Sequence, residues 1–425
     1  MSQFPDGFLW GAATAGHQVE GGNVNADVWP LEWTEPSIFT EPSGDACDHY
    51  HRYPEDIELL AQLGLNAYRF SLEWSRIEPE PGFVSHAALD HYRRVLETCV
   101  HHGVTPVVTY NHFTLPRWMA GRGGWTALDA ADRFAEFATA ATERLGDLLS
   151  WACTLNEPNI TTMLVTTGVL PMGVNQTKPA AGLFEALDVA QPGGAADRFG
   201  PPAGIGGFDP MVYRMGLLAA DVETMGAAHR MATQAIKAVA GHVKVGWTLA
   251  LVDFQPAEGG EERWAQARRL AQTDWLAVSA EDDFVGVQTY SRQRIGPDGA
   301  LSPAEGAPTM QTGWEVYPEA LGHTVRLAAE QAGVPVLVTE NGMATDDDEA
   351  RLAYTRAALE GLAGCLADGI DVRGYLHWAL LDNFEWTSGF AKTFGLIAVD
   401  RRTFARTVKP SGRWLGRVAA GDGLD

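Results

Sequence analysis

Eight short runs of apolar and β-branched residues recur along the chain, with helical patterns between them. The runs cover residues 8–15, 66–74, 104–110, 150–155, 243–252, 283–290, 334–339 and 372–381. Two of them contain PVVT and VPVLVT, which are almost continuously apolar, as is typical of parallel strands buried on both faces. We therefore predict an α/β fold, a single (β/α)8 TIM barrel with loop insertions that spans residues 1–425. An open doubly wound sheet is the alternative, but no glycine-rich phosphate turn follows an early strand.

The connecting segments carry helix signals and one long irregular stretch. Helices are predicted from near Pro54 to Gly64 and at residues 87–102 and 128–145, and a glycine ends the first two. Residues 171–210, which follow the fourth run, are rich in Pro, Gly and Ala. This insertion is either a tolerated surface loop or a lid that shapes the mouth of the barrel.

Charge and cysteine content narrow the classes of partner and compartment. The 54 acidic and 31 basic residues give a net charge of −23, which disfavours nucleic acid and anionic membranes as partners. The first ten residues lack the basic and apolar regions of a signal peptide, and no apolar run approaches the roughly 20 residues of a membrane helix. The 4 cysteines form no CxxC pair. We expect a cytoplasmic protein that acts on a neutral small molecule.

Two glutamates, Glu157 and Glu340, stand at the ends of the fourth and seventh predicted strands. In a barrel such strand ends converge on one face, where active sites form. Retaining glycosidases use two carboxyl groups about 5–5.5 Å apart, one as nucleophile and the other as acid/base. Amides, histidine and tryptophan at the other strand ends suit the hydroxyls and the apolar face of a neutral sugar. A helix cap or a surface ion pair is the alternative role for either glutamate.

Several motifs together resemble glycoside hydrolase family 1, the β-glucosidase family. They are TLNEP at 154–158, VTENG at 338–342, YRFSLEWSRIEP at 68–79, YNHFTLPRW at 110–118, GWEVYP at 313–318 and LLDNFEW at 380–386. The opening FLWGAATAGHQVEGG and the end of the chain match as well, so the similarity is collinear over the whole length. The resemblance implies a retaining β-glycosidase, most simply a β-glucosidase, without cofactor or metal.

The resemblance also implies a role for each matching position. Glu340 is the expected nucleophile and Glu157 the expected acid/base, with a pKa raised by the charge of the nucleophile. Arg69 and Tyr290 are expected to support the nucleophile. The expected substrate-binding residues are Gln18, His112, Asn156, Trp378, Glu385, Trp386 and, on the aglycone side, Trp314.

Two departures from the family pattern leave the fine specificity open. Residues 288–290 read Gln-Thr-Tyr where the family often has Asn-Tyr-Tyr, and Phe113 stands where Trp is frequent. Glu385 argues against phosphorylated sugars, and Glu157 argues against thioglucosidases, which carry Gln there. Open alternatives are a β-galactosidase or β-fucosidase, a transglycosylating or disaccharide-specific enzyme, and a non-catalytic sugar-binding protein. The oligomeric state is also open, because homo-oligomers are common among proteins that resemble this chain.

Two motifs look like metal sites. Cys47, Asp48, His49 and His51 lie close together, but no second half-site with matching spacing accompanies them. We expect these residues to serve packing. The acidic run at 346–349 is expected to cap the helix that follows it rather than to bind calcium.

Overall fold

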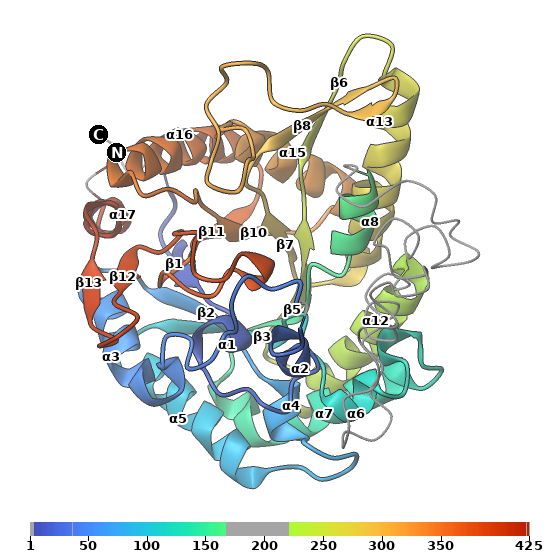
Figure 1. The fold of residues 1–425 in the computed structure, drawn as a ribbon, viewed down its shortest axis with the longest axis vertical. Coiled ribbons are helices and arrows are strands. Elements are labelled where there is room, and N and C mark those ends of the chain that lie inside the picture. Colours follow the sequence, from blue (N-terminus) through green and yellow to red (C-terminus); the bar gives the residue numbers. More distant parts are fainter. Residues whose placement is uncertain (1–3, 36, 167–220, 422, 425) are drawn as a thin grey trace.

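The computed structural model describes residues 4–35, 37–166, 221–421 and 423–424. Within this part of the chain, parallel strands close into a barrel in the order β1-β11-β10-β7-β5-β4-β3-β2 (Figure 1). These strands are β1 (Leu9–Ala13), β2 (Ala67–Ser71), β3 (Thr105–Asn111), β4 (Trp151–Asn156), β5 (Lys244–Ala250), β7 (Val285–Gln288), β10 (Val336–Asn341) and β11 (Val372–Trp378). Each overlaps one predicted run. The predicted barrel is therefore confirmed, and the open-sheet alternative is wrong.

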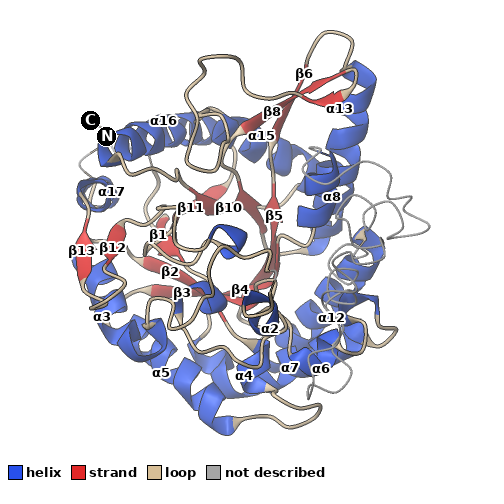
Figure 2. Ribbon diagram, viewed as in Figure 1, coloured by secondary structure: helices blue, strands red, loops and turns tan. Residues whose placement is uncertain are grey.

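Helices form an outer layer around the strands (Figure 2). The long ones are α3 (His49–Gln62), α5 (His86–His101), α7 (Ala130–Leu145), α12 (Val222–Val239), α15 (Ala320–Ala332), α16 (Asp348–Ala367) and α17 (Pro410–Ala419). Shorter elements near the strand ends include α1 (Gly16–Val19), α2 (Trp29–Glu32), α4 (Trp74–Ile77), α6 (Arg117–Ala120), α8 (Ile160–Thr166) and α13 (Glu261–Arg268), with strands β6 (Asp253–Pro256), β8 (Arg292–Gly296), β9 (Gly299–Ala300), β12 (Ile397–Val399) and β13 (Arg406–Val408). Over the described residues, none of the helices combines the length and apolar character that crossing a membrane requires.

Amphipathic helices bury one face against the barrel, and α5 illustrates how. Its side chains at Leu89, Tyr92, Leu96 and Cys99 repeat at helical spacing and are all buried. The Ser85 Oγ accepts a hydrogen bond from the Ala88 backbone N–H at 3.3 Å and so caps its first turn.

Some predicted boundaries need correction. Helix α3 begins at His49 rather than near Pro54, because the Arg52 N–H already bonds to the Asp48 carbonyl at 3.0 Å and the proline is accommodated inside the helix. Gly64, at φ +87°, follows the end of that helix as predicted. The cap of α16 is also confirmed, since the Asp347 carboxylate accepts from two N–H groups of its first turn. The predicted insertion at 171–210 lies outside the described residues.

Candidate active site

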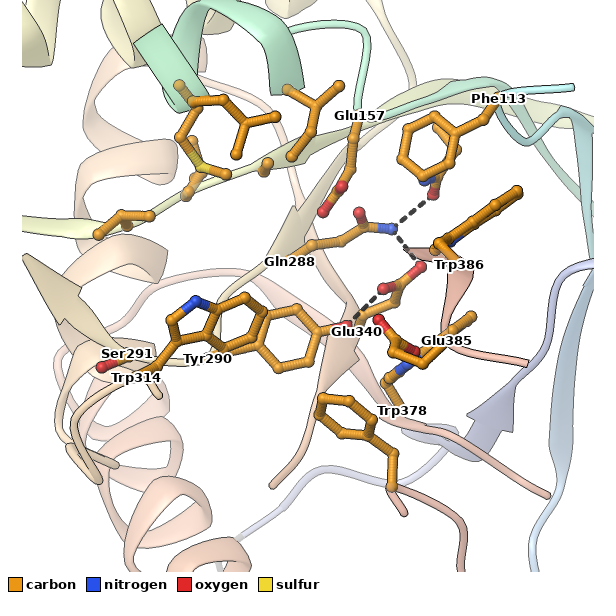
Figure 3. Close-up of a pocket in the computed structure, with 18 of the residues that line it drawn as sticks. Phe113, Glu157, Gln288, Tyr290, Ser291, Trp314, Glu340, Trp378, Glu385 and Trp386 are labelled. Atoms are coloured by element: carbon orange, nitrogen blue, oxygen red, sulfur yellow. Dashed lines mark hydrogen bonds between the residues drawn. The ribbon is translucent and has the colours of Figure 1, made fainter. Parts of the chain in front are cut away.

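A cavity of about 310 Å³ opens at the carboxyl ends of the barrel strands (Figure 3). All the site residues predicted from the sequence line it except Arg69, which is buried beneath it. The predicted lining residues are Gln18, His112, Asn156, Glu157, Tyr290, Trp314, Glu340, Trp378, Glu385 and Trp386. The barrel therefore brings together side chains that are spread over most of the chain.

Irregularities in the strands lie next to both glutamates. The pairing of β10 with β7 shifts register between Val338 and Glu340, and that of β4 with β5 shifts between Cys153 and Asn156. Such bulges bend a strand and re-aim the side chains that follow. Directly after β4, the Glu157 N–H bonds to the Thr248 carbonyl of β5 at 2.8 Å. The ends of these two strands are thus shaped to turn both carboxyl groups into the cavity.

Three cavity residues adopt left-handed backbone conformations. Phe113, Glu157 and Trp386 have φ values of +69°, +44° and +47°. Side chains with a Cβ rarely occupy this region, and each such residue costs of order 1–3 kcal/mol. The surrounding contacts must hold these residues in place, as is frequent where a side chain is positioned for function.

Three side chains donate hydrogen bonds to the buried carboxylate of Glu340. Arg69 Nη1 and Gln288 Nε2 reach its Oε1 at 2.6 and 2.9 Å. Tyr290 Oη reaches its Oε2 at 2.5 Å (Figure 3). Each of these donors favours the ionised carboxylate.

Glu157 has a different environment across the cavity. Among the described residues, no side chain donates a hydrogen bond to its carboxyl group. Burial raises its pKa well above the usual range, and the negative charge of Glu340 raises it further. Burial also raises the pKa of Glu340, but the Arg69 charge and the Tyr290 hydroxyl oppose that rise. Glu340 is therefore the carboxyl group that ionises first.

The orientation of the Asn156 amide is set by three donors. Its Oδ1 accepts from Arg69 Nη2 at 2.5 Å, from Gln288 Nε2 at 2.9 Å and from Thr248 Oγ1 at 3.1 Å. The Nδ2 group is left to donate, and His112 Nε2 lies 3.2 Å from it. Burial and the Arg69 charge lower the pKa of His112 well below the usual value, so its ring is neutral.

The end of the cavity near Glu385 combines unpartnered polar atoms with flat aromatic rings. Gln18 Nε2 donates to the Phe384 carbonyl at 2.8 Å, but Gln18 Oε1 and Glu385 Oε2 are buried without a partner among the described residues. Burial and the charge of Glu340 raise the pKa of Glu385 to about 8. The Trp378 ring lies nearly parallel to His112, at 5.9 Å between centroids. Such a surface fits the hydroxyls and the C–H face of one sugar ring.

The predicted aglycone tryptophan lies at the opposite end of the cavity. Trp314 is 44% exposed, and its ring centroid lies 5.5 Å from that of Tyr290. Figure 3 shows Trp314 and Ser291 at one end, Glu385 and Trp386 at the other, and both glutamates between them.

Several residues that line the cavity were given no individual role by the sequence prediction. Gln288 is the most important, because its amide reaches both Asn156 and Glu340. Its position two residues before Tyr290, at the end of a buried strand, is the signal that could have identified it. Phe113 and Phe394 also line the cavity. Phe113 is distinguished in the sequence only as a departure from the family pattern, and nothing distinguishes Phe394 from a core phenylalanine.

The cysteine–histidine motif has ordinary structural partners. His49 Nδ1 lies 2.7 Å from Asp56 Oδ2, and His51 Nδ1 lies 2.7 Å from Asp48 Oδ1. Cys47 Sγ donates to a backbone carbonyl at 3.3 Å. Over the residues with described positions, no three metal-binding side chains cluster.

Comparison with known proteins places the chain in a family. Residues 1–424 match Glycosyl hydrolase family 1. A 1,4-β-D-glucan glucohydrolase of Thermotoga neapolitana is 33% identical over 460 residues, covering 100% of both chains. The crystal structure of β-glycosidase BGL167 has a TM-score of 0.87 and 51% identity over 99% of this chain and 98% of that one. A β-glucosidase from Thermotoga maritima in complex with glucoimidazole has a TM-score of 0.82 and 29% identity, covering 100% of both. The chain therefore belongs to glycosyl hydrolase family 1, and it is a hydrolase of O-glycosides.

Proposed function

We propose that this protein is a retaining β-glucosidase in which Glu340 is the nucleophile and Glu157 the general acid/base. The observation that carries the assignment is the unequal environment of the two carboxyl groups. Arg69, Gln288 and Tyr290 hold Glu340 in its ionised form. No described side chain donates in this way to Glu157, which keeps its proton to a higher pH.

In the first step, a Glu340 oxygen attacks the anomeric carbon and forms the ester bond of a glycosyl-enzyme. The bond from that carbon to the leaving oxygen breaks at the same time, and Glu157 transfers its proton to this oxygen. The leaving group departs as a neutral alcohol. Ester formation removes the charge on Glu340, so one cause of the raised Glu157 pKa disappears and Glu157 is left as a carboxylate.

In the second step, Glu157 acts as the base. It takes a proton from water while the water oxygen attacks the anomeric carbon from the face that the alcohol has left. The ester bond breaks, and Glu340 is restored as a carboxylate. Two inversions give net retention, and both carboxyl groups return to their starting protonation states.

The polar end of the cavity supplies the expected contacts to the sugar. Asn156 Nδ2 is proposed to bond the 2-hydroxyl, and the three donors that already occupy the Asn156 oxygen support this assignment. Gln18, His112, Glu385 and Trp386 are proposed to bind the remaining hydroxyls, with Trp378 beneath the ring. Glucose is the proposed sugar, which agrees with the glucoimidazole complex of the relative from Thermotoga maritima.

We further propose that the whole chain acts as one catalytic domain in the cytoplasm. All four cysteines are free and buried, which is compatible with a reducing compartment. The net charge of −23 suits a neutral glycoside rather than an anionic partner.

The test is hydrolysis of nitrophenyl β-glycosides by the wild type and by Glu340→Gly, with and without azide. Glu340→Gly should lose at least about 10⁴-fold in kcat, because the covalent route is closed. Azide should restore turnover with an activated glucoside and yield the α-glucosyl azide, since the small anion attacks once from the nucleophile's side. Glu349→Gly removes an exposed carboxyl group nearby and serves as the control that keeps full activity.

Several results would contradict the proposal. Retained activity in Glu340→Gly would remove the nucleophile assignment. A β-configured azide product would contradict the proposed geometry of attack. A larger kcat/KM for the galactoside or fucoside than for the glucoside would leave the mechanism intact and correct the sugar.

A further inference from the structure

The two ends of the cavity differ in chemistry. Within the described part of the chain, Gln18 Oε1, Gln288 Oε1 and Glu385 Oε2 are buried and have no hydrogen-bond partner. Burying a polar atom without a hydrogen bond costs free energy, so these atoms indicate the part of the cavity that binds the hydroxyl groups of the sugar. All three residues lie at the catalytic glutamates or toward the Trp386 end, as Figure 3 shows for Gln288 and Glu385.

The opposite end has an apolar wall. Ile160 lies on α8, three residues after Glu157, and Leu251 and Val252 follow the end of β5. The pairing of Asp253 with Arg292 places Val252 beside Ser291. Ser291 lies next to Trp314 in Figure 3. These aliphatic side chains and the exposed Trp314 indole therefore surround the same space, on the leaving-group side of Glu157.

The polar side chains at this end are already bonded to the protein. Ser291 Oγ donates to the Glu315 carbonyl at 2.5 Å. The Arg292 guanidinium donates through Nη2 and Nε to the Glu315 carboxylate at 2.7 and 3.1 Å. Gln293 Nε2 donates to the Leu301 carbonyl at 2.6 Å. Among the described lining residues, none at this end has a buried polar atom left without a partner.

We propose that the aglycone site of this enzyme selects a hydrophobic alcohol, such as an alkyl or aryl group, over a second sugar. The inference rests on the proposed function, because the site is defined by the position of Glu157. A sugar in this space would lose hydrogen bonds to water and find few replacements, which is costly for each hydroxyl. Binding of an alkyl or aryl group would instead remove from water both its own apolar surface and that of the cavity wall.

The test compares kcat/KM for methyl, butyl and hexyl β-glucosides and for cellobiose, each measured as released glucose and counted as two glucose molecules per turnover for cellobiose. Each methylene that leaves water should raise kcat/KM about two- to fourfold, so the hexyl glucoside should exceed the methyl glucoside by about 30-fold or more. It should also exceed cellobiose. Leaving-group chemistry alone would make cellobiose the better substrate of these two, because an alkanol leaves less readily than a sugar hydroxyl.

Two tryptophan variants test whether the dependence on chain length arises at the proposed site or from the loss of any exposed tryptophan. Trp314→Ser removes the indole at the proposed site and should flatten the dependence on chain length to less than about twofold per three methylenes. Trp33→Ser removes a tryptophan that is 57% exposed and outside the cavity, and it should keep the steep dependence. Trp33 is 57% and Trp314 44% exposed, so neither side chain belongs to the buried core and neither change should prevent folding.

The outcomes distinguish this inference from the assigned reaction. Hydrolysis of nitrophenyl β-glucoside together with equal rates for methyl and hexyl glucosides would overturn the hydrophobic site and leave the function standing. A higher kcat/KM for cellobiose than for the hexyl glucoside would do the same. Failure to hydrolyse any β-glucoside would overturn both proposals.

Discussion

The buried pair of Arg69 and Glu340 allows a quantitative test of how the proposed nucleophile is held. The two side chains are 0% and 5% exposed, and they meet at 2.6 Å. Arg69 also donates to Asn156 at 2.5 Å and to Thr109 Oγ1 at 3.0 Å. Removal of one partner from such a buried pair typically costs about 3–5 kcal/mol, because the other charge remains without compensation. We therefore expect Arg69→Met to lower the free energy of unfolding by about that amount at pH 7.

The double variant shows whether the cost arises from the pair itself. In Arg69→Met/Glu340→Gln no charge is left unpaired, so its destabilisation should be smaller than the sum of the two single effects by at least about 2 kcal/mol. The measurement is urea unfolding of all four proteins, followed by tryptophan fluorescence and checked for reversibility. Additivity within about 0.5 kcal/mol would refute the idea that the ion pair is what holds the Glu340 carboxylate.

The pH dependence supplies a second check with a defined sign. Burial already raises the pKa of Glu340 above its usual value. A raised pKa means that the stability contributed by this group is present at low pH and is lost as the pH rises through the folded-state pKa. Without Arg69 that pKa rises further, so Arg69→Met should lose more stability than the wild type between pH 5 and pH 7. Parallel stability curves would contradict the argument.

Three more predictions concern the proposed acid/base, a buried ion pair and a close backbone approach. Glu157→Gln should abolish the alkaline limb of kcat/KM for a dinitrophenyl glucoside, because the wild-type limb reports loss of the Glu157 proton, whose pKa is raised; a persisting limb would assign it elsewhere. Asp56→Asn should lower the free energy of unfolding by about 3–5 kcal/mol at pH 7, since it leaves the buried Arg406 guanidinium unpaired. The wild type should lose this advantage over Asp56→Asn as the pH falls through the lowered Asp56 pKa. The measurement is the difference in urea midpoint between the two proteins at pH 7 and at pH 3, and an unchanged difference would contradict the prediction. Gly342→Ala should prevent normal folding, judged by soluble yield and circular dichroism, because its Cβ would overlap a backbone carbonyl of β11, whereas Gly361→Ala in α16 should be tolerated.

The barrel could be predicted because its strands are buried on both faces. This burial requires apolar runs such as PVVT in β3, and the runs are visible without any knowledge of their neighbours. The site residues at the strand ends could be predicted for the same reason, since the carboxyl ends of parallel strands meet on one face. Glu157, Glu340 and Trp378 are of this kind.

The contacts within the site could not be predicted in the same way. The donors to Glu340 come from β2, from the end of β7 and from the segment that follows β7. Which atoms meet depends on bulges that shift register near Glu340 and Asn156. The left-handed backbone at Glu157 has no sequence signature, because it is imposed by the surrounding structure on a residue that disfavours it. The apolar wall could not be predicted either, because the sequence pattern continues the fifth strand through Leu251 and Val252, whereas the strand ends at Ala250.

The closing of the barrel ties catalysis to the last stage of folding. The ion pair beneath the site joins residues 271 positions apart, and the Gln18 amide bonds to a carbonyl 366 positions away. Contacts between such distant segments form slowly, because a long loop must close before they gain any stability. Strand β1 and strand β11 must pair before these side chains meet. During refolding, turnover should therefore return only after the helical signal has recovered, which makes glucoside hydrolysis a reporter of barrel closure.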